Sequence, residues 1–471
     1  MADIARLLSQ HGVSVTIATT PLNAARIRPM LHLSTTVPEP HNIQLVELHV
    51  PLLESGLPEG CESMELVPSR NLIRNFLEAF SKLQKPLEQL IEKMKPAPTC
   101  LLVDKHLHWT QDVSRKFQIP RILFDGTCCF YLLSIHNLLK SKSCYESVPD
   151  SQPIMVPGLP HKIELTRSQL PLDLNPESQD FSDIHQKIRA SEEGAYGMVV
   201  NSFQDLELDY VKEYKKVKDG KVWCIGPVSL SYRGEQDLAK RGNKATVDEN
   251  FCMKWLDSWP PRSVVYVCLG TLNRLALVQF KELALSLEAC NRPFIWVMRE
   301  DDSGEGNKWL SEEGFGERTK GRGFIINNGW APQVLILSHP AIGVFLTHCG
   351  WNSTLEAICA GVPMVTWPMF GDQFLNQKLI VQILGAGEPL GNEVFVPIGK
   401  QDKFGAMIKG EKILEAIDKV MGEGTQKEEK KERSRKLAKL AKQSMEAGGS
   451  SYENMKMLVE DIAKLAFGNP Q

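Results

Sequence analysis

Short apolar strand patterns alternate with longer helical patterns along most of this chain, and this alternation restricts the possible folds more than any other feature. The first series of strand patterns falls at Val15–Thr19, Ile43–Leu48, Cys100–Asp104, Arg121–Phe124 and Met198–Asn201. The second series falls at Val264–Cys268, Pro293–Met298, Gly323–Asn327, Ile342–Thr347 and Pro363–Trp367. Alternating strands and helices favour parallel sheets covered on both faces. We therefore predict an α/β protein with two doubly wound domains that face a cleft.

A polar stretch separates the two series. Residues 231–250 contain almost no large apolar side chains, which is typical of a linker. We predict a first domain over 1–230, a second over 251–450, and a C-terminal helix over 451–471 that docks back on the body. The charged stretch Gln426–Lys442 mixes both signs at helical spacing, which favours a solvated helix face over a nucleic-acid-binding arm.

The composition argues against several classes of function. The 54 Lys and Arg nearly balance the 57 Asp and Glu, so electrostatics gives no reason to expect nucleic acid or an anionic membrane as partner. The 11 cysteines are odd in number and include no CxxC pair, which indicates neither a disulfide framework nor a zinc site. No apolar run approaches the roughly 18 residues of a membrane span, and charges near the start argue against a signal peptide. We expect a cytoplasmic protein with reduced cysteines and no metal or other cofactor.

The segment Trp330–Gln373 carries the most informative chemistry. Its middle reads as a buried strand, a glycine-containing turn and a helix. Such a turn presents free backbone N–H groups and the positive end of a helix to an anion. His348, Asn352 and Ser353 add donors at the same place, and Glu356 lies one turn further on, within reach of a vicinal diol. A nucleoside diphosphate, with two phosphates and a ribose, matches this set of groups.

Each of these residues also has a simpler structural interpretation. Ser353 and Glu356 match a helix capping box, and taken alone that role is favoured. His348 could be a hydrogen-bonded histidine at the end of a strand. The other candidates could be core aromatics or helix-start residues: Trp330, Trp351, Trp367, Asp372 and Gln373. Only the segment as a whole favours a ligand site.

The complete segment, WAPQVLILSHPAIGVFLTHCGWNSTLEAICAGVPMVTWPMFGDQFLNQ, closely resembles the signature box of plant secondary-product UDP-dependent glycosyltransferases in spacing and length. Other stretches, including VVNSFQDLELDYV, GKVWCIGPVSL and KWLDSWPPRSVVYVCLGTL, resemble members that glucosylate flavonoids, terpenoids and hormones. The resemblance implies a GT-B fold of two Rossmann-like domains, with the donor in the C-terminal domain. It also implies a monomer that transfers glucose, with inversion, from UDP-glucose to a hydroxyl group of a small lipophilic acceptor.

The same resemblance assigns the residues that bind the donor. Those implied for uracil and ribose are Trp330, Ala331, Gln333 and Glu356. Those implied for the phosphates are Thr271, His348, Asn352 and Ser353, where Thr271 replaces the family's serine and keeps its hydroxyl. Those implied for the sugar hydroxyls are Trp351, Asp372 and Gln373. Glutamine at the last of these positions usually accompanies UDP-glucose in the family.

The catalytic pair is predicted to be incomplete. Displacement at the anomeric carbon needs a general base, because an acceptor hydroxyl stays protonated at neutral pH. The family uses a histidine in a loop after its first strand, oriented by an aspartate that corresponds to Asp104, for which a helix N-cap is the structural alternative. Because the chain opens at the helix that follows this loop, we expect a truncated N-terminal domain and weak or absent transfer. His106 and His108 leave open a replacement base or an H-x-H metal site.

Two other functions remain as alternatives. A catalytically dead UDP-sugar-binding protein would keep the donor site without the base. A dehydrogenase that uses NAD would share the sheet architecture, but neither half of the chain shows GxGxxG after its first strand pattern.

Overall fold

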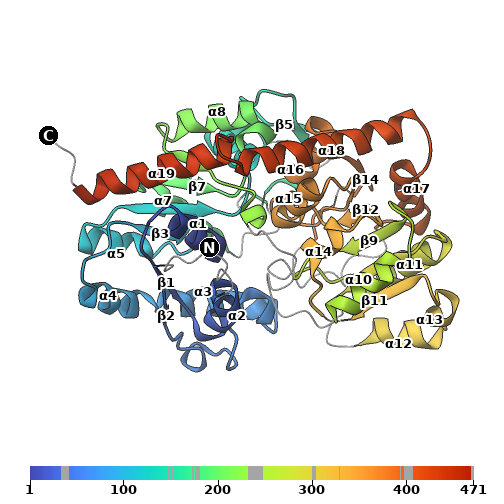
Figure 1. The fold of residues 1–471 in the computed structure, drawn as a ribbon, viewed down its shortest axis with the longest axis horizontal. Helices are drawn as coiled ribbons and strands as arrows, with labels where there is room; N and C mark the ends of the chain where they lie inside the picture. Colours follow the sequence, from blue (N-terminus) through green and yellow to red (C-terminus); the bar gives the residue numbers. More distant parts are fainter. Residues whose placement is uncertain are drawn as a thin grey trace. The chain divides into compact units, whose positions relative to one another are not determined.

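The computed structural model in Figure 1 contains two compact units, each built from discontinuous stretches of the chain. The structure describes residues 1–32, 42–146, 148–149, 152–171, 174–175, 181–231, 248–299, 304–327, 329–392, 394–396 and 407–467. The first unit comprises Met1–Cys129, Gln179–Arg233 and Gln443–Gln471, and the second comprises Phe130–Ser178 and Gly234–Lys442. Residues 130–178, which the sequence interpretation placed in the first domain, therefore group with the second unit. Most of the predicted linker lies outside the described residues.

The second unit contains a six-stranded parallel sheet in the order β11-β10-β9-β12-β13-β14. Its strands are β9 (Val264–Cys268), β10 (Phe294–Met298), β11 (Gly323–Asn327), β12 (Ile342–Thr347), β13 (Met364–Thr366) and β14 (Gly387–Pro389). Numbered within this sheet, the order is 3-2-1-4-5-6, which is a common order of the predicted doubly wound fold. The winding direction reverses between β9 and β12, and ligands of such sheets bind where the carboxyl ends of the strands meet at this point.

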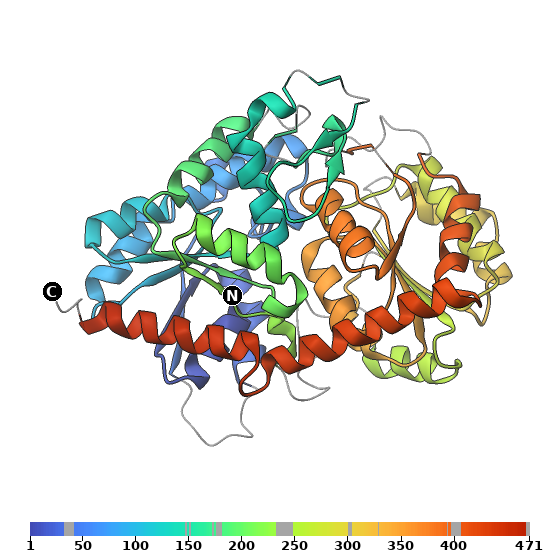
Figure 2. The same ribbon diagram turned by 90° about the horizontal axis from the view of Figure 1, so that it is seen from above.

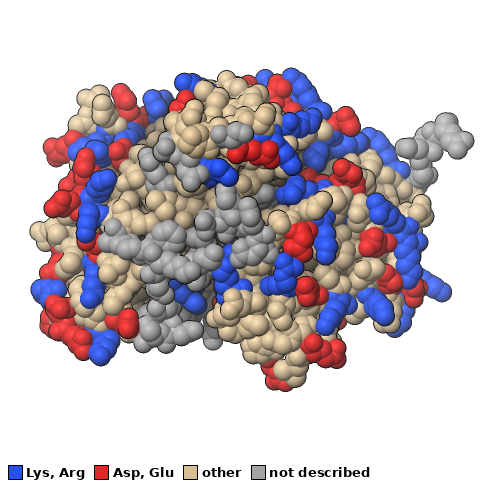
Figure 3. All heavy atoms as spheres, turned by 180° about the vertical axis from the view of Figure 1, so that it is seen from behind, with Lys and Arg blue, Asp and Glu red and all other residues tan. Residues whose placement is uncertain are grey.

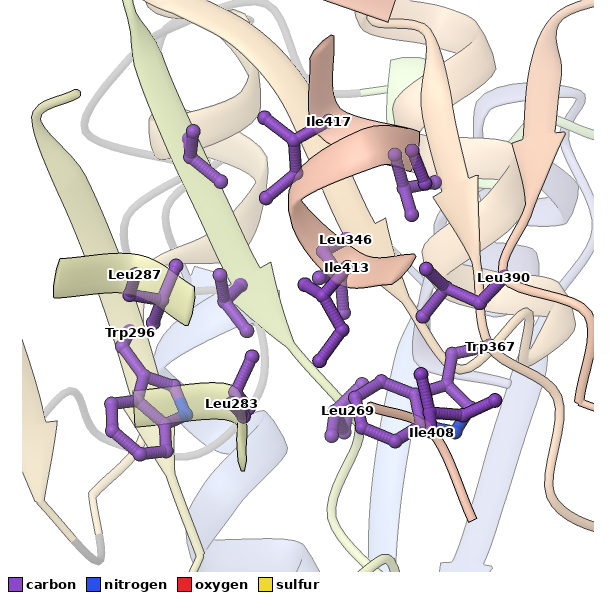
Figure 4. Close-up of a cluster of buried hydrophobic side chains, with 14 of the residues drawn as sticks. Leu269, Leu283, Leu287, Trp296, Leu346, Trp367, Leu390, Ile408, Ile413 and Ile417 are labelled. Atoms are coloured by element: carbon purple, nitrogen blue, oxygen red, sulfur yellow. The ribbon is translucent and has the colours of Figure 1, made fainter. Parts of the chain in front are cut away.

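The strands of this sheet are nearly continuous apolar runs because helices cover both of its faces. Every residue of β10 and of β12 is buried. On one face the core includes side chains from α11 (Leu277–Ala289) and α17 (Gly410–Met421), and Figure 4 shows Leu283 and Ile413 gathered there with Leu346 of β12. This packing holds the ends of β9 and β12 in place, and those ends carry the candidate site.

The first unit contains two separate parallel sheets. Four strands pair in the order β3 (Leu101–Asp104), β4 (Arg121–Asp125), β7 (Gly197–Val200) and β8 (Val222–Cys224). The other sheet consists of β1 (Val15–Thr19) and β2 (Ile43–Glu47). Among the described residues, β1 and β3 are each paired along one edge, and both are only partly buried.

The first helix is α1 (Ala2–Gln10), which ends just before Gly12. Gly12 has φ +81°, a backbone conformation that glycine adopts without a steric penalty. The apolar face of α1, formed by Ile4, Leu7 and Leu8, is buried in one core with side chains from β4, β7 and β8. The same core includes Leu458 of α19 (Ser450–Phe467), the long C-terminal helix drawn in red in Figure 2.

The remaining helices connect and cover the sheets. In chain order they are α2 (Pro21–His32), α3 (Ile73–Ser81), α4 (Gln84–Lys93), α5 (Thr110–Phe117), α6 (Cys129–Lys140), α7 (Ser182–Glu192), α8 (Leu208–Val217), α10 (Glu249–Asp257), α12 (Glu305–Glu312), α13 (Phe315–Arg318), α14 (Gln333–Ser338), α15 (Trp351–Ala360), α16 (Gln373–Lys378) and α18 (Thr425–Met445). A short antiparallel pair is formed by β5 (Ile154–Met155) and β6 (Glu164–Leu165). Helix α18 covers the charged stretch that was predicted to be a solvated helix.

Candidate functional site

The candidate donor site lies at the carboxyl ends of β9 and β12, where the winding of the second sheet reverses. The loop after β9 contains Thr271, and the turn after β12 runs from His348 to Gly350, directly before α15. Gly350 is the N-cap of α15 and supplies no side chain to the orphan N–H groups of the first turn. These N–H groups and the helix dipole together form an anion site of the kind that the sequence predicts.

His348 packs directly against two glycine backbones at this site. A Cβ atom added to Gly350 would lie 2.4 Å from Nε2 of His348, and one added to Gly270 would lie 2.5 Å from the same atom. Desolvation by the surrounding protein lowers the pKa of His348 to about 4, so the ring is neutral near pH 7. Its Nδ1 has no hydrogen-bond partner among the described residues. The ring is therefore a neutral group that can donate one hydrogen bond to a bound anion.

The turn before α15 is held in an unusual conformation. Cys349 has φ +67°, which is uncommon for a residue other than glycine. Its carbonyl oxygen accepts a hydrogen bond of 2.8 Å from Nδ2 of Asn376, and the same nitrogen donates to Oδ2 of Asp372 at 2.7 Å. The predicted sugar contact Asp372 is thereby tied to the predicted phosphate turn through Asn376. Sequence reasoning missed Asn376, although it follows Asp372 by one helical turn.

A second network links the residues predicted to hold the ribose. Nε2 of Gln333 donates to Oε2 of Glu356 at 2.8 Å and to Oγ of Ser353 at 3.0 Å. The hydroxyl of Tyr266 donates to Oε1 of Gln333 at 3.2 Å. Sequence reasoning missed Tyr266, whose signal is one hydroxyl-bearing residue in the otherwise apolar strand β9. The network orients the Glu356 carboxylate beside the first turn of α15, where a diol next to a bound diphosphate would lie.

The capping interpretation of Ser353 and Glu356 is wrong. The N-cap of α15 is Gly350, so Ser353 is the third residue inside the helix and makes no N-cap hydrogen bond. Both side chains instead meet Gln333, which begins α14. They therefore belong to a side-chain network with Gln333 and not to a helix cap.

The remaining predicted donor residues lie on the same sheet edge or in adjoining elements. Trp351 is buried as the first residue of α15, and Asn352 beside it is exposed. Trp330 is half-buried and is followed by the buried Ala331, just before α14. Oε1 of the buried Gln373 accepts hydrogen bonds from the backbone N–H groups of residues 369 and 370, at 2.8 and 3.1 Å. These bonds commit the side-chain oxygen of Gln373 to the loop and leave its amino group as a donor.

Asp104 lies in the first unit, as the last residue of β3. Its Oδ1 accepts a hydrogen bond of 2.9 Å from the backbone N–H of His106 and one of 2.8 Å from the ring Nδ1 of His106. The next helix, α5, begins only at Thr110, with Trp109 as its N-cap and no side-chain cap. The N-cap interpretation of Asp104 is therefore wrong, and the structure joins it to one of the two histidines that the sequence singled out.

The described part of the chain shows whether side chains are grouped to hold a metal, whether a helix could cross a membrane, and how surface charges are distributed. No cluster of three or more His, Cys, Asp or Glu side chains is arranged there to hold a metal, so the H-x-H interpretation gains no third ligand. No helix in those ranges is long and apolar enough to cross a membrane. On the face drawn in Figure 3, basic and acidic side chains are interspersed, in keeping with the net charge of −3.

Comparison with known proteins gives consistent similarities. Residues 247–395, which include most of the candidate donor site, match the family described as UDP-glucoronosyl and UDP-glucosyl transferase. The chain is 46% identical over 467 residues to UDP-glycosyltransferase 73E1 of Stevia rebaudiana, covering 98% of this chain and 93% of that protein. It is similar to the structure of UGT73P12 of Glycyrrhiza uralensis in complex with glycyrrhetinic acid 3-O-monoglucuronide, with TM-score 0.88, 34% identity, and coverage of 99% and 93%. It is also similar to TcCGT1 in complex with UDP, with TM-score 0.79, 25% identity, and coverage of 98% and 96%.

These alignments do not bear out the predicted truncation. The Stevia relative aligns with 98% of this chain and over 93% of its own length.

Proposed function

Because the chain belongs to the UDP-glycosyltransferase family, we propose that it transfers glucose from UDP-glucose, with inversion, to a hydroxyl group of a small lipophilic acceptor. Membership of the family makes it a glycosyltransferase with two Rossmann-like domains of the GT-B type. The observation that supports the donor most strongly is the neutral His348 beside the N-terminus of α15, at the reversal point of the sheet.

The donor site is suited to a nucleoside diphosphate sugar. The first turn of α15, with His348 and the hydroxyls of Ser353 and Thr271, offers uncharged donors to a diphosphate without adding cationic side chains. Glu356, oriented by Gln333, can accept both hydroxyl protons of a ribose. UDP in the similar structure of TcCGT1 supports this choice of nucleotide.

Glucose is proposed as the transferred sugar on the basis of Gln373. Its oxygen is fixed by two backbone N–H groups, so its amino group has a defined direction in which to donate to a sugar hydroxyl. Asp372, held by Asn376, would accept from a neighbouring hydroxyl. A donor and an acceptor at adjacent positions can distinguish the orientations of the hydroxyl groups on a hexose ring.

The acceptor is proposed to be small and lipophilic, of the flavonoid, terpenoid or hormone type. Glycyrrhetinic acid 3-O-monoglucuronide, bound in the similar structure from Glycyrrhiza uralensis, supports a small-molecule acceptor. We further propose that the protein acts as a cytoplasmic monomer without a metal or other cofactor, as the family resemblance implies. The uncharged hydrogen-bond donors around the proposed diphosphate position support catalysis without a bound cation.

Titration calorimetry with UDP, combined with mass spectrometry of transfer products, tests this function. We expect UDP to bind to the folded chain and UDP-glucose to yield a glucoside with at least one member of a panel of phenols and terpenoid alcohols. Folded protein that fails to bind UDP would contradict the donor site. Binding of UDP-glucose without transfer to any acceptor would favour the alternative of a UDP-sugar-binding protein.

A further inference from the structure

We propose that Arg299 is a further donor-binding residue, whose guanidinium group donates a hydrogen bond to a carbonyl oxygen of the uracil ring. This inference rests on the proposed function, because it adds a contact to the same nucleotide site. It concerns residues of the second unit alone.

Arg299 follows directly after β10, at the edge of the sheet where the candidate site lies. Because the strands of this sheet are parallel, their carboxyl ends meet at that edge. The strand order places the end of β10 between the end of β11, which leads to Trp330, and the end of β9, which leads to Thr271. Along this edge, Arg299 therefore lies between a residue predicted for the base and one predicted for the phosphates.

The alternation of side chains along β10 indicates the face of the sheet on which Arg299 lies. Trp296 and Met298 belong to the core that α11 and α17 share with this sheet. Successive residues of a strand point to opposite faces, so Arg299 continues the row on the other face. Strand β9 alternates in the same way, with Tyr266 and Cys268 on the face away from that core. Arg299 thus shares a face with these two residues.

The charges that act on Cys268 place the guanidinium group near the residues predicted to hold the ribose. Burial raises the pKa of the Cys268 thiol, and the positive charge of Arg299 opposes that rise. The carboxylate of Glu356 acts on the same thiol and adds to the rise. Coulomb interactions weaken with distance, so both charged groups lie close to this one thiol. Arg299 and Glu356 therefore border the same part of the site.

The guanidinium group is not fully committed to hydrogen bonds within the protein. Nε of Arg299 is shielded from solvent and has no hydrogen-bond partner among the described residues. Arg322, which precedes β11 at the opposite edge of the sheet, differs because it donates to three backbone carbonyl oxygens. A buried N–H without a partner costs free energy, and a rotation of the flexible side chain toward a bound acceptor recovers it.

The choice of uracil follows from hydrogen-bonding chemistry and from position. Arginine carries only donors, and uracil offers two carbonyl oxygens, O2 and O4, as acceptors. Strand β11, which leads to Trp330, is hydrogen-bonded to β10, whereas β9 separates β10 from β12, which leads to His348. Neighbouring strands lie about 4.8 Å apart. Arg299 is thus one strand from Trp330 and two strands from His348, which favours the base over the phosphates.

Two variants at the end of β10 test the assignment. R299M removes the donors and keeps a long side chain, and R299K keeps the charge without the planar group. R292M is the matched control, because Arg292 precedes the same strand and pairs with Asp418 at 3.3 Å, away from the site. Calorimetry measures the affinities for UDP, UMP, 2-thio-UDP and 4-thio-UDP, where sulfur replaces one carbonyl oxygen in each thio analogue. Thermal unfolding shows whether each variant is folded.

We expect R299M to lower the affinities for UDP and UMP by the same factor, roughly 10- to 100-fold, because the lost contact is on the base. R299K should recover only part of this loss, and R292M should stay within about twofold of the unaltered chain. In the unaltered chain one thio analogue should bind more weakly than UDP, because sulfur is the weaker acceptor. R299M should abolish that difference, because the donor to that position is gone.

Three results would overturn the assignment: an unchanged affinity for UDP in folded R299M, a loss that is larger for UDP than for UMP, or a thio effect that R299M leaves in place. If R299M does not fold, R299K carries the same comparison of UDP with UMP. All of these results require UDP binding by the unaltered chain, so they contradict Arg299 alone. Folded, unaltered chain that binds no UDP would overturn the proposed function as well as the contact.

Discussion

Replacement of Gly350 by alanine tests the donor site through one added methyl group. Gly350 has φ −59° and ψ 137°, values that alanine adopts freely, so the substitution introduces no backbone strain. Its Cβ would lie 2.4 Å from Nε2 of His348. An ordinary carbon–nitrogen contact is about 3.5 Å, so the ring must move by roughly 1 Å. A shift of this size breaks a hydrogen bond between the ring and a bound phosphate.

The expected magnitude follows from the loss of that bond. A hydrogen bond to a charged group contributes about 1.5–3 kcal/mol, which corresponds to a UDP affinity roughly 10- to 150-fold lower. The matched control is G316A in the same unit, because a Cβ at Gly316 meets no atom within 4 Å. Calorimetry with UDP measures both variants, and thermal unfolding shows whether they remain folded. If folded G350A bound UDP as tightly as G316A does, the placement of the phosphates beside His348 would be refuted.

Three further predictions concern the same site. Q333L removes the hydrogen bonds that orient Ser353 and Glu356, so UDP affinity should fall about tenfold by calorimetry, and an unchanged affinity would argue against a ribose contact there. Q373A leaves the N–H groups of residues 369 and 370 unpaired, so the free energy of unfolding in urea should fall by about 1–3 kcal/mol, and no loss would show that water replaces the side chain. The folded-state pKa of His348, about 4, lies below its ordinary 6.5, so the unfolded chain takes up the proton first and stability should fall as the pH drops from 6.5 to 4. Urea denaturation of H348Q should show a shallower fall over this range, and an equal slope in both proteins would contradict a neutral, desolvated ring.

The strand pattern of the sequence predicts the second unit well. Apolar runs such as Ile342–Thr347 coincide with strands because a parallel sheet covered on both faces requires continuous apolar residues. The doubly wound order of the sheet follows from that alternation. The glycine-containing turn between β12 and α15 is likewise visible in the sequence, because it interrupts two strongly apolar elements.

The first unit is less predictable, because pairing between distant strands leaves little trace in a local pattern. The separation of β1 and β2 from the four-stranded sheet was not foreseen. The helical spacing of Ile4, Leu7 and Leu8 marks an apolar face, but it does not reveal that this face shares a core with residues of β4, β7 and β8. Local patterns specify elements, whereas the partners of those elements depend on the whole fold.

For the candidate site, too, the sequence predicts the residue types but not the contacts between residues that are distant in the chain. Residue types and spacing identified His348, Ser353 and Glu356, but capping was the favoured local role of the last two. The decisive contact comes from Gln333, twenty residues before Ser353, and spacing alone does not place it there. The pairing of Asp104 with His106 depends on side-chain rotamers, which no sequence pattern specifies.

A crystal structure of the chain soaked with UDP tests the donor site most directly. We predict the diphosphate at the N-terminus of α15 within hydrogen-bond distance of His348, the ribose hydroxyls on Glu356, and the uracil stacked on Trp330. A diphosphate bound elsewhere, or one that leaves His348 and Glu356 without contact to the nucleotide, would contradict it.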